Sequence, residues 1–525
     1  MKKFINFLIL FLCVSHLNSQ ETIKDFTKPN VLFIAIDDLK PTIGSYGDSF
    51  AITPNIDKIS KNATVFMNNH TQQAICGPSR ASVLTGKRPD YTKVRDLETK
   101  MRDVHPDILT IPQYFKENGY ITAATGKIYD FRCIDEFGDK PSWTIPYIQE
   151  NDLEYPEGYG NPVLAYYQNE DIKKRFSELI AEAKSKGIED GMTYAKEIYK
   201  PPFETSDAPD EAYRDGAIAK HAMQLLDTVS KDSKPFFLGV GFKRPHLPFV
   251  ASQKYWDLYD RDKIKIATNQ KRVENGVEIA YHNSFEILKY KTPEIDYIVK
   301  NGLLELDPDI QKKLIHGYYA SVSFVDTQIG KIMDKLKEKG LDKNTIIVIW
   351  GDHGWHLGDH SMWNKHSNFE QATRSPLIIY APNTNKKQLN VTSPTALLDI
   401  FPTLCELSQM EVPKHLDGKS LRPIMNGTVK QVKPYAVSQY PREKHTGYSF
   451  RTDRYRYTVW LGNNKKSTDR ITNKDILAQE LYDYNNDPLE RVNIFGDKKH
   501  KRTQQTLVEH SNTFFKAEAE KAKQN

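Results

Sequence analysis

Residues 30–38 read NVLFIAIDD, an apolar run of strand length that ends in two adjacent aspartates. Further apolar runs follow along the chain, and many are separated by helical patterns. The clearest lie at residues 121–125, 236–240, 346–350 and 376–380. Continuous rather than alternating apolar runs are typical of strands that are buried under helices on both faces. The sequence therefore predicts an α/β fold with a large, mostly parallel or mixed sheet flanked by helices.

The remaining segments predict how the chain is organised. Residues 321–339 show helical spacing of apolar side chains just before Gly340. Residues 25–430 are expected to form a catalytic domain, and residues 434–525 a smaller α+β subdomain. That subdomain has strand-like stretches at residues 447–451, 455–460 and 480–483, and an amphipathic helix near residues 507–523. The charged segment 151–209 is expected to be inserted over the domain, either as surface decoration or in a substrate-shaping role.

Charged or metal-liganding residues follow four of the predicted strands: Asp37 and Asp38, Lys127, His246, and Asp352 with His353. Ligands bind beyond the carboxyl ends of the strands in such sheets. Adjacent aspartates after a buried strand are costly unless they are solvated or paired. Carboxylate oxygens suit a hard cation such as Ca²⁺, and an imidazole nitrogen could complete the ligand set. Helix capping is the alternative for the first pair alone, but the second strand end favours a metal.

The pentapeptide Cys76-Gly77-Pro78-Ser79-Arg80 leads into a short predicted helix that ends at Gly86. Cys76 would lie at the start of that helix, where backbone N–H groups and the dipole favour an anion. A lone cysteine is otherwise most often a small buried apolar residue. Side chains available to bind the oxygens of such an anion are Arg80, Lys127, Lys365 and His246.

The N-terminus predicts export. Two lysines at positions 2 and 3 precede an apolar run over residues 4–14 and a polar stretch over residues 15–20. This order is typical of a secretory signal peptide, assigned to residues 1–19. The run is shorter than the roughly 20 residues of a membrane span, so none is predicted. The protein is expected in the periplasm, the extracellular space or, depending on the organism, the lysosome.

Overall charge gives little information about partners, and the cysteine content leaves the disulfide pairing open. The 73 basic and 68 acidic residues nearly balance, so no nucleic-acid partner is predicted. Of four cysteines, Cys13 is lost with the signal peptide, which leaves Cys76, Cys133 and Cys405. Whether the last two pair is left open by the sequence.

Several segments carry a family resemblance: residues 30–39, 73–80, 84–90, 111–120, 243–249, 352–355, 365–369 and 438–442. Through them, and through the C-x-P-x-R motif at Cys76, the chain resembles the type I sulfatases of the alkaline phosphatase superfamily. Within that family it is similar to the iduronate-2-sulfatase branch. The resemblance runs over about residues 30–493 and is interrupted mainly at residues 151–209 and 260–307.

The resemblance implies a mechanism. A maturation enzyme would oxidise Cys76 to Cα-formylglycine, whose hydrate attacks sulfur and expels the sugar alkoxide. The implied ligands of Ca²⁺ are this hydrate, Asp37, Asp38, Asp352 and His353. The residues expected to hold the charge on the sulfuryl oxygens are Arg80, Lys127 and Lys365. His246 is suited to protonate the leaving alcohol.

Two positions depart from the iduronate-2-sulfatase pattern. Asp130 stands where that branch has a histidine, three residues after the active-site lysine, and His366 replaces a tyrosine. Both lie near the expected sugar, so iduronate 2-sulfate is not assumed as the substrate. Plausible sugar contacts, with simple packing as the alternative, are Trp355, Trp363, His356 and His366.

The sequence thus predicts an exported, calcium-dependent sulfatase acting on a sulfated polysaccharide or its oligosaccharides. A glycosaminoglycan and an algal polymer such as ulvan are both possible substrates. One alternative is a phosphatase or phosphodiesterase of the same superfamily, which would need extra Asp or His ligands for a second metal. The other is a catalytically silent sulfated-glycan-binding protein. Such a protein would have lost the cysteine, the arginine or the metal aspartates, and none is lost.

Overall fold

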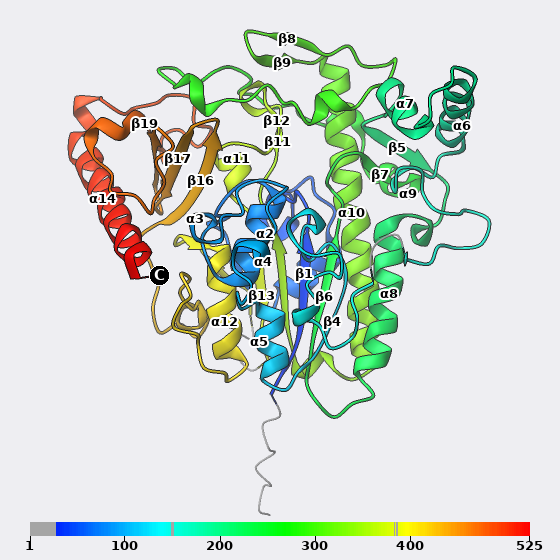
Figure 1. Ribbon diagram of the computed structural model, residues 1–525, viewed down its shortest axis with the longest axis horizontal. Coiled ribbons are helices and arrows are strands. Elements are labelled where there is room, and N and C mark those ends of the chain that lie inside the picture. The colour runs from blue at the N-terminus through cyan, green and yellow to red at the C-terminus, as the bar shows by residue number, and fades with distance from the viewer. Residues whose placement is uncertain (1–27, 149–151, 383, 385–386, 525) are drawn as a thin grey trace, which may run out of the picture.

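A seven-stranded sheet runs through the middle of the molecule, with strand order β14-β2-β13-β10-β1-β6-β4 (Figure 1). Its strands are β1 (Asn30–Ile36), β2 (Thr64–Phe66), β4 (Ile121–Gly126), β6 (Phe236–Phe242), β10 (Thr345–Gly351), β13 (Leu377–Tyr380) and β14 (Leu389–Val391). The neighbours β4, β6, β1 and β10 are parallel. Strand β13 is antiparallel to both β10 and β2, so the sheet is mixed. The predicted α/β class is confirmed, and all five apolar runs form strands.

The computed structural model describes residues 28–148, 152–382, 384 and 387–524, so the predicted signal peptide lies outside the described residues. Among the described residues, no helix has both the length and the hydropathy needed to cross a membrane. The three cysteines of this part are all buried and free, so Cys133 and Cys405 are not paired.

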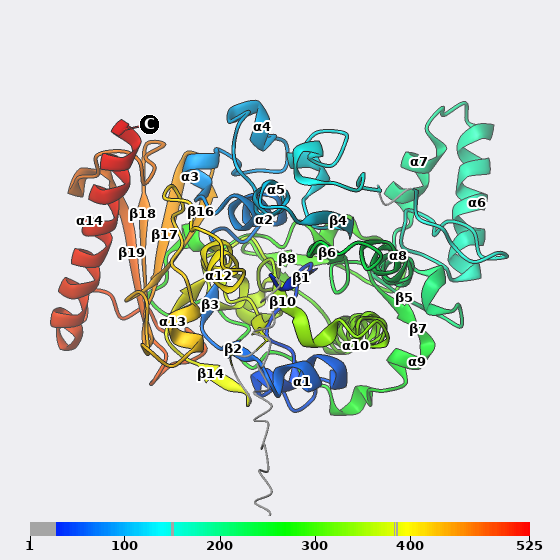
Figure 2. The same cartoon turned by 90° about the horizontal axis from the view of Figure 1, so that it is seen from below.

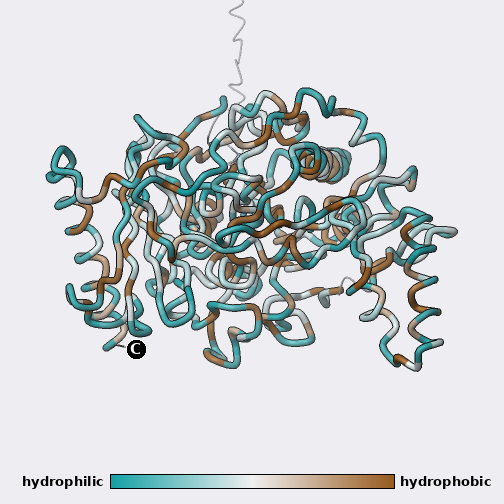
Figure 3. The backbone as a smooth tube through the Cα atoms, turned by 90° about the horizontal axis from the view of Figure 1, so that it is seen from above, coloured by the Kyte–Doolittle hydropathy of each residue, from teal (hydrophilic) through white to brown (hydrophobic). Residues whose placement is uncertain are grey.

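Strand β1 is buried on both faces because its side chains alternate between two cores. Leu32, Ile34 and Ile36 face a core built with α8 (Arg214–Val229) and α10 (Pro308–Glu338). The alternate residues face a second core built with α2 (Cys76–Thr85), α5 (Ile111–Glu117) and α12 (Ile400–Leu407). Helices therefore cover both faces, as Figure 2 shows. Hydrophobic stretches cross the middle of the backbone tube in Figure 3.

Helix α10 begins at Pro308, whereas the sequence pattern predicted a start at residue 321. Gly317 interrupts the apolar pattern in the first turns, because close packing leaves no room for a side chain at that position. A Cβ at Gly317 would lie 2.8 Å from Phe249 and 2.9 Å from Trp256. Asp307 caps the helix by accepting a hydrogen bond from the backbone N–H of Asp309, and Pro308 occupies the first turn, where it is tolerated.

A second, four-stranded antiparallel sheet lies beside the first, on the left in Figures 1 and 2. It contains β16 (Ala436–Arg442), β17 (His445–Arg451), β18 (Tyr455–Leu461) and β19 (Ile476–Asp483), and helix α14 (Lys501–Gln524) accompanies it. Phe514 and Phe515 of α14 pack against Phe450 of the sheet. The predicted C-terminal strands and helix are confirmed; the boundary near residues 430–434 stays a prediction.

The predicted insertion forms its own elements at the right edge of Figure 1: α6 (Glu170–Ser185), α7 (Gly191–Ile198) and β5 (Phe203–Ser206). Strand β5 pairs in parallel with β7 (Phe249–Ser252), which follows the carboxyl end of β6 by a few residues. The insertion is thereby attached next to one of the four strand ends that the sequence singled out. The segment 260–307 carries the hairpin of β8 (Ile298–Lys300) and β9 (Leu303–Glu305) at the top of the same figure.

Candidate active site

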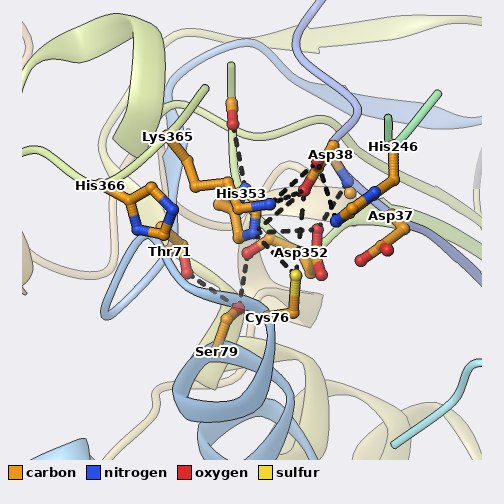
Figure 4. Close-up of polar contacts among 12 residues, drawn as sticks. Asp37, Asp38, Thr71, Cys76, Ser79, His246, Asp352, His353, Lys365 and His366 are labelled. Atoms are coloured by element: carbon orange, nitrogen blue, oxygen red, sulfur yellow. Dashed lines mark hydrogen bonds and ion pairs between the residues drawn. The ribbon is translucent and has the colours of Figure 1, made fainter. Parts of the chain in front are cut away.

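The carboxyl ends of β1 and β10 bring four metal-liganding side chains together, because the two strands are parallel neighbours. Asp37 and Asp38 follow β1, and Asp352 and His353 follow β10. The turn is tight: Asp38 has a φ of 58°, and its backbone N–H donates to Asp352 Oδ1 at 3.0 Å. Each of the four residues is at most 1% exposed. Figure 4 shows their side chains converging above Cys76.

This set of side chains fits a hard divalent cation. The ligand atoms of Asp37, Asp38, Cys76 and His246 lie within 4.8 Å of one another, and so do those of Cys76, Asp352 and His353. Burial raises the pKa of Asp38 to about 7, although the nearby lysine ammonium of Lys365 opposes that rise. A cation among the carboxylates would offset this cost of burial. The donor chemistry and the burial therefore agree with the predicted metal site.

Cys76 occupies the N-terminus of α2, as the sequence predicted, and Gly86 ends the helix with a φ of 66°. The Cys76 Sγ atom lies 3.4 Å from His353 Nε2 and 3.9 Å from Asp38 Oδ1. Burial first, and then the charge of Asp37, raises the pKa of the thiol well above its ordinary value. Unmodified Cys76 is therefore a weak nucleophile, since the thiolate is the reactive form.

Hydrogen bonds fix the start of α2 against β10. Thr71 Oγ1 donates to Ser79 Oγ at 2.9 Å, and Ser79 Oγ donates to the backbone carbonyl of Asp352 at 2.5 Å (Figure 4). Gly77 permits close packing, because a Cβ at that position would lie 2.5 Å from Cys133 Sγ. The residues of the C-x-P-x-R motif thus position Cys76 beneath the carboxylates.

The predicted cations line the same centre. Arg80 is fully buried; its Nε contacts Asp352 Oδ2 at 3.0 Å and its Nη2 contacts Asp37 Oδ1 at 3.1 Å. Lys127 Nζ contacts Asp37 Oδ2 at 2.7 Å. Burial opposes ionisation of Asp37, but Lys127 and then Arg80 hold the pKa of that carboxyl well below its usual range. Lys365 Nζ lies 3.1 Å from Asp38 Oδ2. The structure therefore unites all the predicted catalytic and metal residues.

Glu286 also belongs to this centre, and the sequence analysis missed it. Its carboxylate lies 3.0 Å from Lys365 Nζ, 3.1 Å from His246 Nε2 and 3.1 Å from His366 Nε2. Burial opposes its ionisation, but Lys365 and then His246 hold its pKa well below the usual range. Glu286 lies in the segment 260–307, where the family resemblance is interrupted and no motif points to it. Only the path of the folded chain brings it to the site.

The predicted sugar contacts divide into two groups. Trp355, Trp363 and His356 are at most 1% exposed, which favours simple packing, the alternative that the sequence left open for them. Trp355 instead packs under Lys365, whose Nζ lies 4.9 Å from the ring centre. His366 is 5% exposed and bonds to Tyr440 Oη at 2.9 Å, and the 39% exposed Phe285 packs against it.

Asp130, the other departure from the family pattern, is 3% exposed and held by two cations. Arg132 donates to both of its carboxylate oxygens, each at 2.8 Å, and Lys127 Nζ lies 3.5 Å away. Burial opposes ionisation, but Lys127 and Arg132 hold the pKa of Asp130 below its usual range. Asp130 lines a cavity of about 290 Å³ together with Asp37 and His246. It therefore faces the space next to the reaction centre.

Comparisons with known proteins agree with this geometry. A family model described as Sulfatase matches residues 29–410, and a model described as N-sulphoglucosamine sulphohydrolase, C-terminal, matches residues 358–516. Iduronate 2-sulfatase of Mus musculus is 32% identical over 536 residues, which cover 90% of this chain and 91% of that protein.

Two solved structures resemble the fold at identities under 25%, so they bear on the fold alone. One is a protein in complex with its substrate D-glucosamine-2-N,6-O-disulfate, with a TM-score of 0.68 and 21% identity over 94% of this chain and 99% of that chain. The other is the phosphonate monoester hydrolase of Agrobacterium radiobacter, with a TM-score of 0.67 and 20% identity over 93% of this chain and 96% of that chain.

Proposed function

This chain belongs to the sulfatase family and is a sulfuric ester hydrolase, and on that premise we propose that it is an exported, calcium-dependent enzyme that desulfates a sulfated saccharide through a formylglycine derived from Cys76. One observation carries the proposal. Cys76 is the first residue of α2, and its Sγ lies among the ligand atoms at the carboxyl ends of β1 and β10. Those ligand atoms belong to Asp37, Asp38, Asp352 and His353.

The metal would be held by the three carboxylates and by His353 Nε2, and when bound it would supply positive charge that favours an anionic nucleophile. A formylglycine hydrate at position 76 would supply a hydroxyl to attack sulfur and a second one through which sulfate is released. Calcium is favoured over softer metals because three of the four ligands are carboxylates.

The chain's own residues would do the rest of the work. Arg80, Lys127 and Lys365 would bind the sulfuryl oxygens, and they are oriented for it by their contacts with Asp37, Asp38 and Asp352. The N–H groups at the start of α2 add a favourable field for an anion. His246 Nε2 lies next to the cavity and would protonate the leaving alcohol, while its Nδ1 bonds to the carbonyl of Leu247 at 2.6 Å.

A sulfated saccharide is the proposed substrate class. The name of the mouse relative, a sulfatase of iduronate 2-sulfate, supports it. Asp130 and His366 line the region expected to face the sugar, and both differ from the residues of the iduronate-2-sulfatase branch. A glycosaminoglycan or an algal polymer such as ulvan would satisfy the proposal. Secretion would follow from the signal peptide at residues 1–19, and a formylglycine-generating enzyme would be a required partner.

The site favours sulfatase chemistry over a two-metal phosphatase. Within residues 28–148, 152–382, 384 and 387–524, the clusters of possible metal ligands are two groups that share Cys76, so they describe one centre. A catalytically silent binding protein is disfavoured as well, since every predicted catalytic and metal residue is present and in contact with others of the set.

The test is co-expression with a formylglycine-generating enzyme, followed by mass spectrometry of the peptide that contains Cys76. We expect it to be about 18 Da lighter than the thiol form, the loss that formylglycine brings. Matured protein should release sulfate from a panel of sulfated oligosaccharides faster than it releases phosphate from matched phosphate esters, and Cys76→Ala should release neither. An unmodified thiol, or faster phosphate release, would contradict the proposal.

A further inference from the structure

Asp37 and Asp38 are consecutive residues, yet both supply ligand atoms to the same centre. One atom of each lies within 4.8 Å of Cys76 Sγ. Successive side chains of an extended strand point to opposite faces, as the two cores on either side of β1 show. The alternation therefore has to be broken just after β1, so that both carboxylates can reach one metal ion.

A left-handed backbone at Asp38 breaks the alternation. Its φ of 58° lies in a region that residues other than glycine adopt at a cost, and such a conformation persists only where the surrounding structure holds it. On the amide side, the N–H of Asp38 donates to Asp352 Oδ1 at 3.0 Å. Asp352 is itself a proposed metal ligand, so this hydrogen bond depends on how the metal is bound. The turn needs a second anchor that does not.

The Tyr318 hydroxyl is such an anchor. It donates to the backbone carbonyl of Asp38 at 2.8 Å and accepts from the backbone N–H of Lys40 at 2.9 Å. In the part of the chain that the structure describes, neither backbone group has another hydrogen-bond partner. One hydroxyl therefore spans the turn, and its removal would leave the buried carbonyl of Asp38 unpaired, which is costly.

The position of this hydroxyl is fixed by packing. Tyr318 is fully buried on α10, which packs against the central sheet (Figures 1 and 2). The ring of Phe249 lies edge-on to the ring of Tyr318, with 5.6 Å between their centres. The neighbouring Gly317 allows this close approach, because a Cβ there would lie 2.8 Å from Phe249 Cβ. The helix and the sheet therefore place the hydroxyl whether or not a metal is bound.

We propose that Tyr318 is a positioning residue of the metal centre, whose hydroxyl holds the turn at Asp38 so that this carboxylate faces the metal site before the metal binds. The proposal rests on the proposed function, because it takes Asp38 to be a ligand of Ca²⁺. The hydroxyl acts through the backbone, since both of its hydrogen bonds are to main-chain groups. Groups that orient metal ligands typically contribute about tenfold to a hundredfold to metal affinity, so the effect should appear in the Kd for Ca²⁺.

Tyr318→Phe tests the proposal, because it removes the hydroxyl and keeps the ring. In titration calorimetry of metal-stripped, matured protein with Ca²⁺, the Kd should rise about tenfold to a hundredfold. The Ca²⁺ concentration for half-maximal hydrolysis of 4-nitrophenyl sulfate should rise by the same factor. The kcat at saturating Ca²⁺ should recover, because the bound ion then holds Asp38 in place. Tyr319→Phe is the matched control: it removes a hydrogen bond of 2.7 Å to Asp48 from the next residue of α10 and should leave the Kd unchanged.

An unchanged Kd in Tyr318→Phe would overturn the proposal, even if the melting temperature fell, because a purely structural role lowers stability without changing the affinity for Ca²⁺. An equal rise of the Kd in Tyr319→Phe would overturn it as well. If wild type binds no Ca²⁺, the calcium site of the proposed function is contradicted instead. A crystal structure of metal-free Tyr318→Phe would then still decide on the turn. We expect Asp38 to leave the left-handed region, and a φ that stays near 58° would refute the role of Tyr318.

Discussion

Replacing Glu286 by glutamine tests whether this carboxylate orients the catalytic groups. The substitution keeps the shape of the side chain and removes its charge. In the wild type the carboxylate lies 3.0 Å from Lys365 Nζ and 3.1 Å from His246 Nε2. Hydrogen bonds to charged groups contribute about 1.5–3 kcal/mol, and the 16% exposure of the Glu286 side chain favours the lower end.

If the loss of the contact with each of the two partners raises the activation free energy by about 1.5 kcal/mol, kcat should fall about a hundredfold. KM should not rise, because the substrate sulfate is an anion and removal of the carboxylate also removes a repulsion. Steady-state kinetics on matured protein separates the two parameters. Glu294→Gln is the matched control, since Glu294 lies on the same segment and pairs with Lys313 at the surface. A kcat within threefold of wild type, or a fall in kcat explained by a lower melting temperature, would refute the role.

Three further predictions concern the metal, the packing of α2 and the ion pair between Glu370 and Arg451 of the second sheet. Chelation by EDTA should lower the melting temperature, because the buried carboxylates lose the charge of the metal. Ca²⁺ at 100 times its Kd should then restore about 2.7 kcal/mol of the free energy of unfolding. An unchanged melting temperature would argue against a bound metal. Gly77→Ala should destabilise the protein by about 1–3 kcal/mol and impair activity, because the new Cβ would meet Cys133 Sγ at 2.5 Å; urea unfolding and sulfate release check both effects. Burial opposes ionisation of Glu370, but Arg451, at 3.0 Å, lowers its pKa to about 2, below the unfolded value. Glu370→Gln should therefore cost about 3 kcal/mol at pH 7, and the cost should shrink as the pH falls from about 4.5 toward 2; a pH-independent cost in urea unfolding would contradict the ion-pair explanation.

The sequence was sufficient for those parts of the site that parallel strands position. Continuous apolar runs are the signal of a doubly covered sheet, and the carboxyl ends of parallel neighbours meet at one edge. Asp37 and Asp352 are far apart in the chain, yet their strands β1 and β10 pair residue by residue. Convergence of these side chains could therefore be inferred without a structure.

Residues whose position depends on the packing of irregular segments could not be predicted in this way. Glu286 lies on a segment with short 3₁₀ turns and no apolar periodicity, so no pattern relates it to His246 or Lys365. The role of Trp355 could not be predicted for a related reason. An aromatic residue next to a metal-binding motif has the same sequence signature whether it faces a sugar or packs under a lysine, and here it is fully buried.

The two segments where the family resemblance is interrupted each supply a side chain to the centre. Tyr166 comes from the insertion 151–209 and lines the cavity beside His246, and Glu286 comes from the segment 260–307 and contacts His246 directly. For the insertion, the sequence left surface decoration and substrate shaping equally open. The place of Tyr166 in the cavity wall favours substrate shaping for the turn that carries it, whereas α6 and α7 lie at the outer edge of the molecule (Figure 1). On the proposed function, the strand ends would provide the groups that act on sulfate, and the segments that interrupt the resemblance would lie beside the leaving group, where differences in substrate are expected to arise.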